Sequence, residues 1–269
     1  MKRNRLFWDI ETSPNIGLFW RSGYKQNVDY GNILFERQIM CICWKWEQED
    51  EVGALDWRLG EKEMIESFMG VLNRADESVA HNGDKFDLPW IRGRCLYHGL
   101  PMFPTYKTLD TLKLVKGKNG FGLNSNRLDY IACFLGIGCK QETKYGMWKE
   151  LTKAKFLPCT PEEKISANKT MNKMVEYCKN DVVLLQEIYE RIKNYTKPTT
   201  HYGVLNGGDK TLCPECGSYR VVLNKTTTTA LGTIRRNMMC NECRRYFTVS
   251  NKTYHDIVDK RRERRDEEG

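Results

Sequence analysis

The pattern of apolar and polar positions before Thr196 predicts strands mixed with helices. Some segments alternate apolar and polar residues or are continuously apolar, whereas in others apolar residues recur every three or four positions. The strand-like segments are residues 6–11, 33–46, 78–80 and 108–115, and the helical segments are residues 61–72, 90–97, 127–135 and about 161–195. Strands followed by interleaved helices are typical of an α/β domain built around one central sheet. We therefore predict an α/β domain over residues 1–195.

The chain changes character near Thr196, where Thr, Pro and Gly residues replace the periodic pattern. Such residues form turns and linkers. We therefore place a linker at 196–209, a small module at 210–250 and a basic charged tail at 251–269. The part after residue 195 has 14 basic and 9 acidic residues, so it carries a net charge of +5, out of +8 for the whole chain.

The composition excludes wholesale disorder and a membrane-spanning helix. Hydrophobic residues make up 40% of the chain and charged residues 29%, as in soluble globular proteins. The longest purely apolar stretch is 39–44, whereas a helix needs about 20 apolar residues to span a bilayer. Asp9 and Glu11 follow too soon after the N-terminus for an apolar region of signal-peptide length. We expect a cytoplasmic protein, or a virus-encoded intracellular one, with no membrane partner.

The eleven cysteines divide into two groups by their spacing. Seven have no regular spacing, and we interpret them as reduced core thiols; they are Cys41, Cys43, Cys95, Cys133, Cys139, Cys159 and Cys178. The other four form two C-x-x-C pairs, Cys213 with Cys216 and Cys240 with Cys243, separated by 23 residues. This spacing is close to that of a Cys₄ zinc ribbon. So small a module has too little core to fold alone, so we predict one structural Zn²⁺, with iron as the less favoured metal.

Two acidic residues share one face of the first predicted strand. The strand period of two puts Asp9 and Glu11 on one face, and Trp8 and Ile10 on the other. Two carboxylates this close raise each other's pKa unless a cation compensates their charge. The D-x-E pair therefore indicates either a metal site or a solvent-facing edge strand.

A third carboxylate falls on the apolar face of the last predicted helix of this domain. Apolar residues recur at three- and four-residue spacing from Met171 to Ile192, and Asp181 lies inside that stripe. An ionised carboxylate that faces a core is unfavourable unless it is paired or bound to a metal. Tyr177 lies one turn earlier, so its hydroxyl projects beside Asp181, either as a structural hydrogen-bonding group or as part of a site.

Residues 80–90 leave a strand, turn on Gly83 and enter a helix. They contain the sequence Asn82-x-x-x-Phe86-Asp87, in which Asp87 alone could be a helix N-cap. Taken together, the segments F-W-D-I-E-T, N-x-x-x-F-D and Y-x-x-x-D resemble the three motifs of the DEDD superfamily of 3′–5′ exonucleases, tyrosine subclass. The chain looks most like the proofreading exonuclease domain of family B DNA polymerases.

The resemblance implies a ribonuclease H-like mixed sheet flanked by helices, on which four carboxylates converge. It also implies two Mg²⁺ or Mn²⁺ ions about 3.5–4 Å apart, which hold the attacking and leaving oxygens of a phosphoryl displacement. By this resemblance Asp9 bridges the two ions, and Glu11 and Asp181 bind the ion that activates water. Asp87 is expected to bind the second ion or its waters. Tyr177 is expected to orient the attacking water rather than to deprotonate it, because a tyrosine has a reference pKa of about 10.

Substrate contacts are expected from two places. Asn82 and Phe86 lie at the turn before Asp87 and are expected to shape the substrate channel. In the ribbon, arginines flank Tyr246 and Phe247, a combination that suits phosphate contacts and base stacking; they are Arg235, Arg236, Arg244 and Arg245. A ribbon that serves as a protein-docking surface is the alternative.

The net charge of +8 suits a polyanionic partner. The basic run at 260–265 is either a solvated helix or a phosphate-contacting tail.

We predict a metal-dependent 3′–5′ exonuclease that releases nucleoside monophosphates from single-stranded DNA or frayed 3′ ends. A polymerase or another replication or repair protein is expected as a further partner. An RNA 3′–5′ exonuclease on the same fold and a non-catalytic nucleic-acid or partner-binding adaptor are the alternatives. DNA and RNA stay undistinguished, because nothing in the sequence shows how a 2′-hydroxyl is accommodated.

Overall fold

The computed structural model describes residues 4–21, 23, 27–117, 120–138 and 146–268. The chain forms two compact units, the first spanning Asn4–Ile188 and the second beginning at Tyr189. Each unit is described by itself. The domain boundaries drawn from the sequence after residues 195, 209 and 250 stay a prediction.

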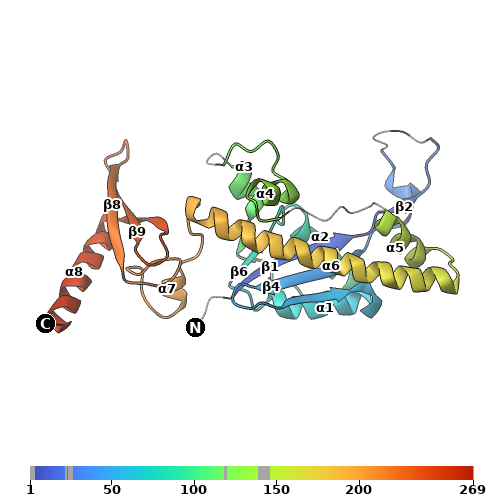
Figure 1. Cartoon of the computed structure of the whole chain (residues 1–269), viewed down its shortest axis with the longest axis horizontal. Helices are drawn as coiled ribbons and strands as arrows, with labels where there is room; N and C mark the ends of the chain where they lie inside the picture. Colours follow the sequence, from blue (N-terminus) through green and yellow to red (C-terminus); the bar gives the residue numbers. More distant parts are fainter. Residues whose placement is uncertain (1–3, 22, 24–26, 118–119, 139–145, 269) are drawn as a thin grey trace. The chain divides into compact units, whose positions relative to one another are not determined.

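The first unit is built around a mixed sheet of five strands in the order β5-β4-β1-β6-β7 (Figure 1). The strands are β1 (Arg5–Thr12), β4 (Ile39–Trp46), β5 (Val52–Asp56), β6 (Glu77–Ala80) and β7 (Thr108–Asp110). β1 is antiparallel to β4, and β4 to β5, whereas β6 is parallel to both of its neighbours. The central position of β1 places its side chains over the middle of the sheet. The predicted α/β fold with one mixed sheet is confirmed.

One face of the sheet is covered by two helices because apolar side chains alternate along β1. Leu6, Trp8 and Ile10 are buried in one core cluster with residues of α1 (Glu61–Leu72) and α2 (Asp87–His98). The Trp8 ring lies 5.1 Å from the ring of a phenylalanine on α1, measured between centroids. This face therefore supplies most of the apolar packing that holds β1 in place.

The opposite face of β1 meets α6 (Pro161–Ile192), a 32-residue helix that runs along the sheet in Figure 1. The Cys178 thiol on α6 donates to the main-chain oxygen of Asp9 at 3.5 Å. Because side chains alternate along a strand, Asp9 and Glu11 point to the side on which α6 lies. The predicted helix at about 161–195 ends as an α-helix at Ile192.

The remaining elements of the first unit are short. They are the paired strands β2 (Ile16–Gly17) and β3 (Ile33–Phe35), the helices α3 (Thr111–Lys116), α4 (Leu128–Phe134) and α5 (Gly146–Phe156), and 3₁₀ turns at Tyr30–Asn32 and Trp57–Leu59. The segment 108–115, expected to be extended, is a strand only as far as Asp110. The Asp110 carboxylate accepts a hydrogen bond from the Leu112 main-chain N–H at 3.0 Å and so begins α3.

Two of the seven cysteines interpreted as reduced core thiols need comment. Cys133 is disulfide-bonded, so its interpretation as a reduced thiol is wrong. Cys139 lies outside the described residues.

The second unit is a three-stranded antiparallel sheet followed by a helix. Its elements are a 3₁₀ turn at Lys193–Tyr195, α7 (Tyr202–Leu205), β8 (Val221–Thr228), β9 (Ile234–Cys240), β10 (Tyr246–Ser250) and α8 (Asn251–Glu268). Ile257 of α8 joins a small core with Cys213 and Met238, so α8 packs on the sheet. Among the described residues, no helix is both long and apolar enough to cross a membrane.

Candidate active site and metal centres

One strand, β1, and one helix, α6, bring three of the predicted carboxylates together. Asp9 and Glu11 lie two residues apart on β1, opposite Cys43 and Cys41 of β4 in the antiparallel register. Asp181 comes from α6 and is only 4% exposed. One carboxylate oxygen from each of these three acids lies within 4.8 Å of the other two. The structure therefore brings together residues that are 170 positions apart in the sequence, as the DEDD resemblance requires.

This donor set fits a divalent cation. Three carboxylates at such separations repel each other when they are ionised, and burial of Asp181 adds a desolvation penalty. Mg²⁺ and Mn²⁺ prefer carboxylate oxygens, and a bound cation would offset both costs. Asp9, Glu11 and Asp181 are the residues that could hold the ion.

The fourth predicted carboxylate, Asp87, lies beside the same strand but outside this group of three. It is the first residue of α2, is 1% exposed, and its Oδ1 accepts a hydrogen bond from the Ile10 main-chain N–H at 3.2 Å. That N–H belongs to the residue between Asp9 and Glu11. The pKa of Asp87 is raised to about 7, chiefly by burial and also by the negative charge of Asp110, while the hydrogen bond from the Ile10 N–H opposes the shift. Near neutral pH this carboxyl can therefore exchange a proton.

Tyr177 stands next to the acidic group on α6, one turn before Asp181. Its ring is buried and meets the Trp148 ring of α5 edge to face, with centroids 5.8 Å apart. Trp148 was missed by the sequence analysis. Apolar residues at 148, 151 and 154 recur at helical spacing and could have revealed the helix that carries it.

Asn82 and Phe86 form the turn that leads into α2. Asn82 has a left-handed backbone with φ of 67°, and its N–H donates to the Asp110 carboxylate at 2.9 Å. A Cβ atom at Gly83 would collide with the side chain of Ala80, so only glycine fits at that point of the turn. Phe86 packs against Trp90, with ring centroids 6.4 Å apart. The part of Asn82 and Phe86 in substrate binding stays a prediction. Asp110, which organises this turn and was not singled out from the sequence, could have been found as a polar residue at a strand end.

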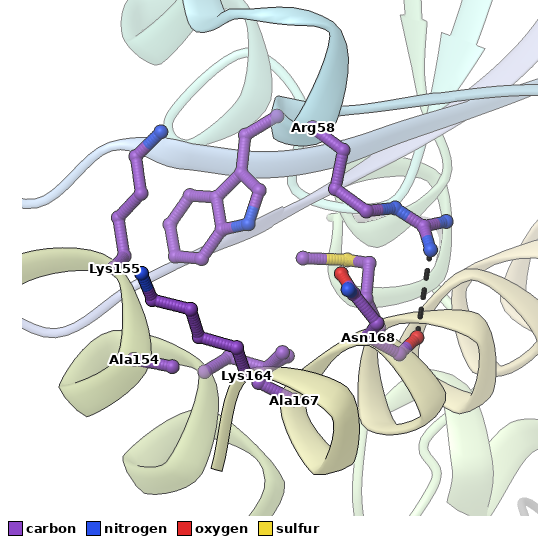
Figure 2. A pocket seen from close by; sticks show the side chains of 9 residues that line it. Arg58, Ala154, Lys155, Lys164, Ala167 and Asn168 are labelled. Carbon is purple, nitrogen blue, oxygen red and sulfur yellow. Dashed lines mark hydrogen bonds between the residues drawn. The ribbon is translucent and has the colours of Figure 1, made fainter. Parts of the chain in front are cut away.

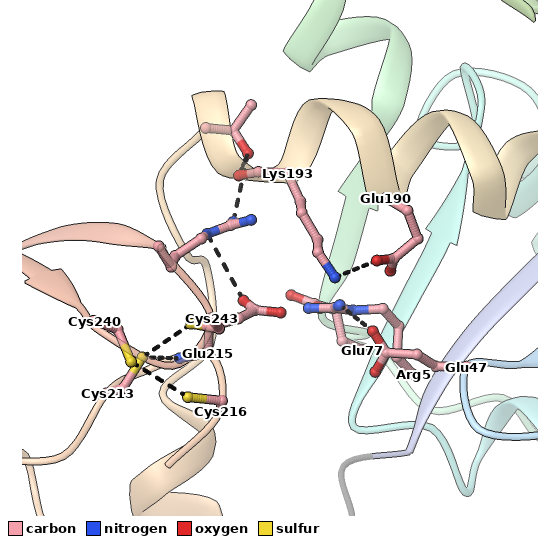
Figure 3. Close-up of polar contacts among 12 residues, drawn as sticks. Arg5, Glu47, Glu77, Glu190, Lys193, Cys213, Glu215, Cys216, Cys240 and Cys243 are labelled. Atoms are coloured by element: carbon pink, nitrogen blue, oxygen red, sulfur yellow. Dashed lines mark hydrogen bonds and ion pairs between the residues drawn. The ribbon is translucent and has the colours of Figure 1, made fainter. Parts of the chain in front are cut away.

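The four cysteines of the two C-x-x-C pairs meet in the second unit (Figure 3). Their sulfur atoms all lie within 4.8 Å of one another, with Cys213 Sγ 3.7 Å from Cys243 Sγ and Cys216 Sγ 3.6 Å from Cys240 Sγ. A tetrahedral site with Zn–S bonds of about 2.3 Å has sulfur–sulfur edges of about 3.8 Å. Burial raises the pKa of the Cys216 thiol to about 12. The arrangement fits a zinc ribbon.

Two similar backbone turns hold the sulfur atoms in this arrangement. The Gly217 N–H donates to the Cys213 oxygen at 3.0 Å, and the Arg244 N–H donates to the Cys240 oxygen at the same distance. Both residues have a left-handed backbone, with φ of 73° at Gly217 and 61° at Arg244. In the first turn the Glu215 N–H also points to the Cys213 sulfur at 3.4 Å. Each pair of cysteines therefore belongs to a turn that presents two sulfur atoms on one side.

Two of the four predicted ribbon arginines are engaged inside the unit. Arg245 is 1% exposed, lies 3.9 Å from Glu215 and donates to the Thr196 hydroxyl at 3.5 Å. Arg236 donates to the side chains of Asn251 and Thr226 at 2.9 and 2.7 Å. These contacts give Arg236 and Arg245 a role in holding the ribbon together. Substrate contact by all four arginines, including the exposed Arg235 and Arg244 of this group, stays a prediction.

A cavity of about 290 Å³ opens between the 3₁₀ turn after β5, α5 and α6 (Figure 2). Its walls include Trp57 and Arg58, and the Lys155 amino group lies 5.3 Å from the Trp57 ring centre. The Arg58 guanidinium is already paired with Asp56 by two contacts of 2.8 Å and also reaches the Asn168 main-chain oxygen at 3.5 Å. Because the charge of the Arg58 guanidinium is already compensated by Asp56, we assign no ligand to this cavity.

Comparison with known proteins identifies a family and similar solved structures. The RNase H superfamily matches residues 48–193. The solved structure of the family B DNA polymerase from the hyperthermophilic archaeon Pyrobaculum calidifontis is similar over 72% of this chain and 25% of that chain, with 16% identity and a TM-score of 0.49. No curated protein matches the sequence. The family match covers more than half of the chain and agrees with the ribonuclease H-like fold inferred from the motifs. The chain belongs to the RNase H superfamily.

Proposed function

We propose that the protein is a metal-dependent 3′–5′ exonuclease that releases nucleoside monophosphates from single-stranded DNA or frayed 3′ ends. The observation that carries this proposal is the convergence of Asp9, Glu11 and Asp181 within 4.8 Å, with Tyr177 one helical turn from Asp181. A merely structural site has no need of three like-charged groups at this separation. Membership of the RNase H superfamily supports a nuclease, because nucleases of this fold use divalent metals bound by carboxylates.

The DEDD resemblance implies how the residues divide the work. Asp9, Glu11 and Asp181 would hold Mg²⁺ or Mn²⁺, with Asp9 as the shared ligand when two ions are bound. When bound, these ions polarise the phosphoryl group and lower the pKa of water. The Asp87 carboxylate of α2 accepts a hydrogen bond from the N–H of Ile10, the residue between the two β1 acids. By the same resemblance, Asp87 would complete the ligand set through the second ion or its waters.

Tyr177 would position the attacking water through its hydroxyl. A tyrosine hydroxyl is mostly protonated at neutral pH, so it can donate or accept a hydrogen bond but is a poor general base. The edge-to-face contact with Trp148 fixes the ring and therefore limits where the hydroxyl can lie. A fixed hydrogen-bonding group contributes to catalysis by orienting the nucleophile.

The test is hydrolysis of labelled oligonucleotides. The full-length protein, with Mg²⁺ or Mn²⁺ added, is incubated with DNA and RNA strands that carry the label at the 5′ end or at the 3′ end. A 3′–5′ exonuclease shortens the 5′-labelled strand stepwise and releases the 3′ label at once as a mononucleotide. Faster degradation of the RNA strands would assign the RNA alternative, and binding without degradation by protein loaded with metal would leave the adaptor.

Matched variants connect the activity to the proposed site. Asp9→Ala and Asp181→Ala should abolish hydrolysis, because each removes a ligand from the group of three. The control is Glu176→Gln on the same helix, whose exposed carboxylate pairs with Lys179 at 2.9 Å and should be dispensable. If Asp9→Ala hydrolyses the strands as fast as the wild type does, the proposal that this site holds the catalytic metal ions is wrong.

A further inference from the structure

A second cavity, of about 300 Å³, lies in the second unit between α8 and the ribbon. Four arginines line it, and we call it the arginine pocket; they are Arg220, Arg261, Arg264 and Arg265. Tyr219 forms part of the wall. Arg261, Arg264 and Arg265 come from one face of α8, since residues three and four apart are neighbours on a helix. The packing of α8 on the ribbon therefore gathers these three cations opposite a fourth from the segment that precedes β8.

The positive charge of the arginine pocket is only partly compensated. Arg220 pairs with Glu242 at 2.9 Å. The described part of the structure gives Arg261, Arg264 and Arg265 no ion pair with an acidic side chain. Arg262, between them in the sequence, lies 3.9 Å from Asp259 instead. Within the described residues, no carboxylate therefore neutralises the three arginines of α8.

The electrostatics of Arg261 show the cost of this clustering. Burial lowers the pKa of Arg261, and the neighbouring charges of Arg265 and Arg264 lower it further. A guanidinium is normally so basic that its pKa is of no consequence. A lowered value here means that the site disfavours its own positive charge, and an anion in the pocket would relieve that.

Tyr219 adds an aromatic surface to the charges. The Arg264 guanidinium lies 4.5 Å from the centre of its ring, and 48% of the Tyr219 residue is exposed. An aromatic ring covered in part by arginine and otherwise open to solvent can accept a nucleobase by stacking, which adds to the phosphate contacts. Guanidinium groups bind phosphate oxygens through pairs of hydrogen bonds. Together these features match a strand whose phosphates repeat and whose bases are unpaired.

We propose that the arginine pocket binds the phosphate backbone of a single-stranded nucleic acid, with a base stacked on Tyr219. This inference rests on the proposed function, because it names where the second unit holds the substrate of the nuclease. It assigns the basic run at 260–265 to phosphate contact rather than to a solvated helix. It also moves the main nucleic-acid contact of the second unit from Arg236 and Arg245, which are engaged inside the ribbon, to the pocket, where the three α8 arginines have no ion pair with a described acidic side chain.

Binding is measured by the fluorescence anisotropy of fluorescein-labelled oligothymidylate, over a series of salt concentrations and without added divalent cation. The full-length wild type is compared with the pocket variant Arg261→Gln/Arg264→Gln/Arg265→Gln. The control variant Lys225→Gln/Lys252→Gln/Arg262→Gln removes the same charge from exposed positions of the same unit. Zinc content by native mass spectrometry checks that each variant keeps the ribbon.

The pocket variant should bind roughly tenfold or more weakly, and the slope of log affinity against log salt should become shallower by about 2, since each phosphate contact on a single strand contributes about 0.7. The control variant should change both quantities much less. Equal losses in the two variants would mean that only net charge matters, and the inference would be wrong. Unlabelled competitors are compared at equal phosphate concentration. If free tripolyphosphate displaces the labelled strand as efficiently as unlabelled oligothymidylate does, the pocket is a site for small anions, and the inference is wrong as well.

Tyr219→Leu keeps every charge and decides the case if the pocket variant loses zinc. It should weaken binding roughly tenfold while leaving the salt slope unchanged, because stacking releases no counterions. Unchanged affinity in Tyr219→Leu would contradict the proposal that a base stacks on Tyr219.

Hydrolysis of the p-nitrophenyl ester of thymidine 5′-monophosphate reports the carboxylate site alone. If the wild type does not hydrolyse this ester, the proposed function is wrong. If the wild type hydrolyses it, and both the pocket variant and Tyr219→Leu bind oligothymidylate as the wild type does, only this inference is wrong.

Discussion

Replacing Asp87 by Asn should change how the stability of the metal-free protein depends on pH. Asp87 is fully buried, and its Oδ1 accepts a hydrogen bond from the Ile10 N–H at 3.2 Å. Asparagine has nearly the same shape and can accept the same hydrogen bond through its amide oxygen, but it does not titrate in this range. The variant therefore removes the proton equilibrium of Asp87 while keeping the contact that joins α2 to β1.

The size and sign of the effect follow from the pKa. Burial raises the pKa of Asp87 from 3.8 to about 7, so the folded protein holds this proton more tightly than the unfolded chain does. The free energy of unfolding of the wild type, relative to the variant, is therefore greatest below about pH 4 and falls until about pH 7. A shift of this size corresponds to at most about 4 kcal/mol, because one pKa unit equals about 1.4 kcal/mol.

Tryptophan fluorescence is a selective assay for this comparison. All seven tryptophans precede residue 189, so their emission reports on the first unit and not on the ribbon. Urea unfolding of both proteins at each pH, without added metal, gives the difference in free energy at equal pH, in which the other titrating groups cancel. Above pH 7, Mg²⁺ should stabilise the wild type more than the variant, because the ionised carboxylate supports metal binding. A difference between the two proteins that stays constant from pH 4 to pH 7 would show that Asp87 does not titrate in the folded state, and the argument from burial would be wrong.

Three further predictions concern the other groups. Tyr177→Phe should keep metal binding but slow the chemical step in single-turnover assays, and an unchanged rate would return Tyr177 to a structural role. Asp9→Asn should raise the free energy of unfolding in metal-free buffer by about 1 to 3 kcal/mol, because it removes one of three carboxylates within 4.8 Å; destabilisation in urea titrations would contradict this. Native mass spectrometry should find one zinc per chain, and Cys216→Ser should lose it whatever the Mg²⁺ concentration, whereas zinc-free wild type would refute the ribbon metal.

The carboxylate group could be predicted because its signals are local. A strand period of two places Asp9 beside Glu11, and an acidic residue inside an apolar helical stripe marks Asp181, so each needs only a few neighbouring residues to be recognised. The family resemblance then joined segments that periodicity alone cannot join. The structure adds that the Asp87 side chain accepts a hydrogen bond from the β1 backbone and lies outside the group of three, a distinction that spacing along the chain does not contain.

The parts that escaped prediction depend on contacts between distant segments. The end of β7 was not foreseen because a single side chain, Asp110, caps the following helix and also holds the N–H of Asn82, 28 residues earlier. The arginine pocket was invisible for a similar reason. The run at 260–265 shows only that charge is present, whereas the contact between Arg264 and Tyr219 depends on how α8 packs on the ribbon.

The two units present charge clusters of opposite sign, and each cluster is unfavourable in the protein alone. Three carboxylates within 4.8 Å repel each other in the first unit, and in the second unit burial, together with the charges of neighbouring arginines, lowers the pKa of Arg261. Folding has to offset both costs through packing, by α1 and α2 on the sheet in one case and by the small ribbon core in the other. A nucleic acid strand with divalent cations supplies what each cluster lacks, cations for the carboxylates and phosphates for the arginines. The same ligand therefore relieves both costs, and that shared complement is the physical argument for treating both units as parts of one nucleic-acid enzyme.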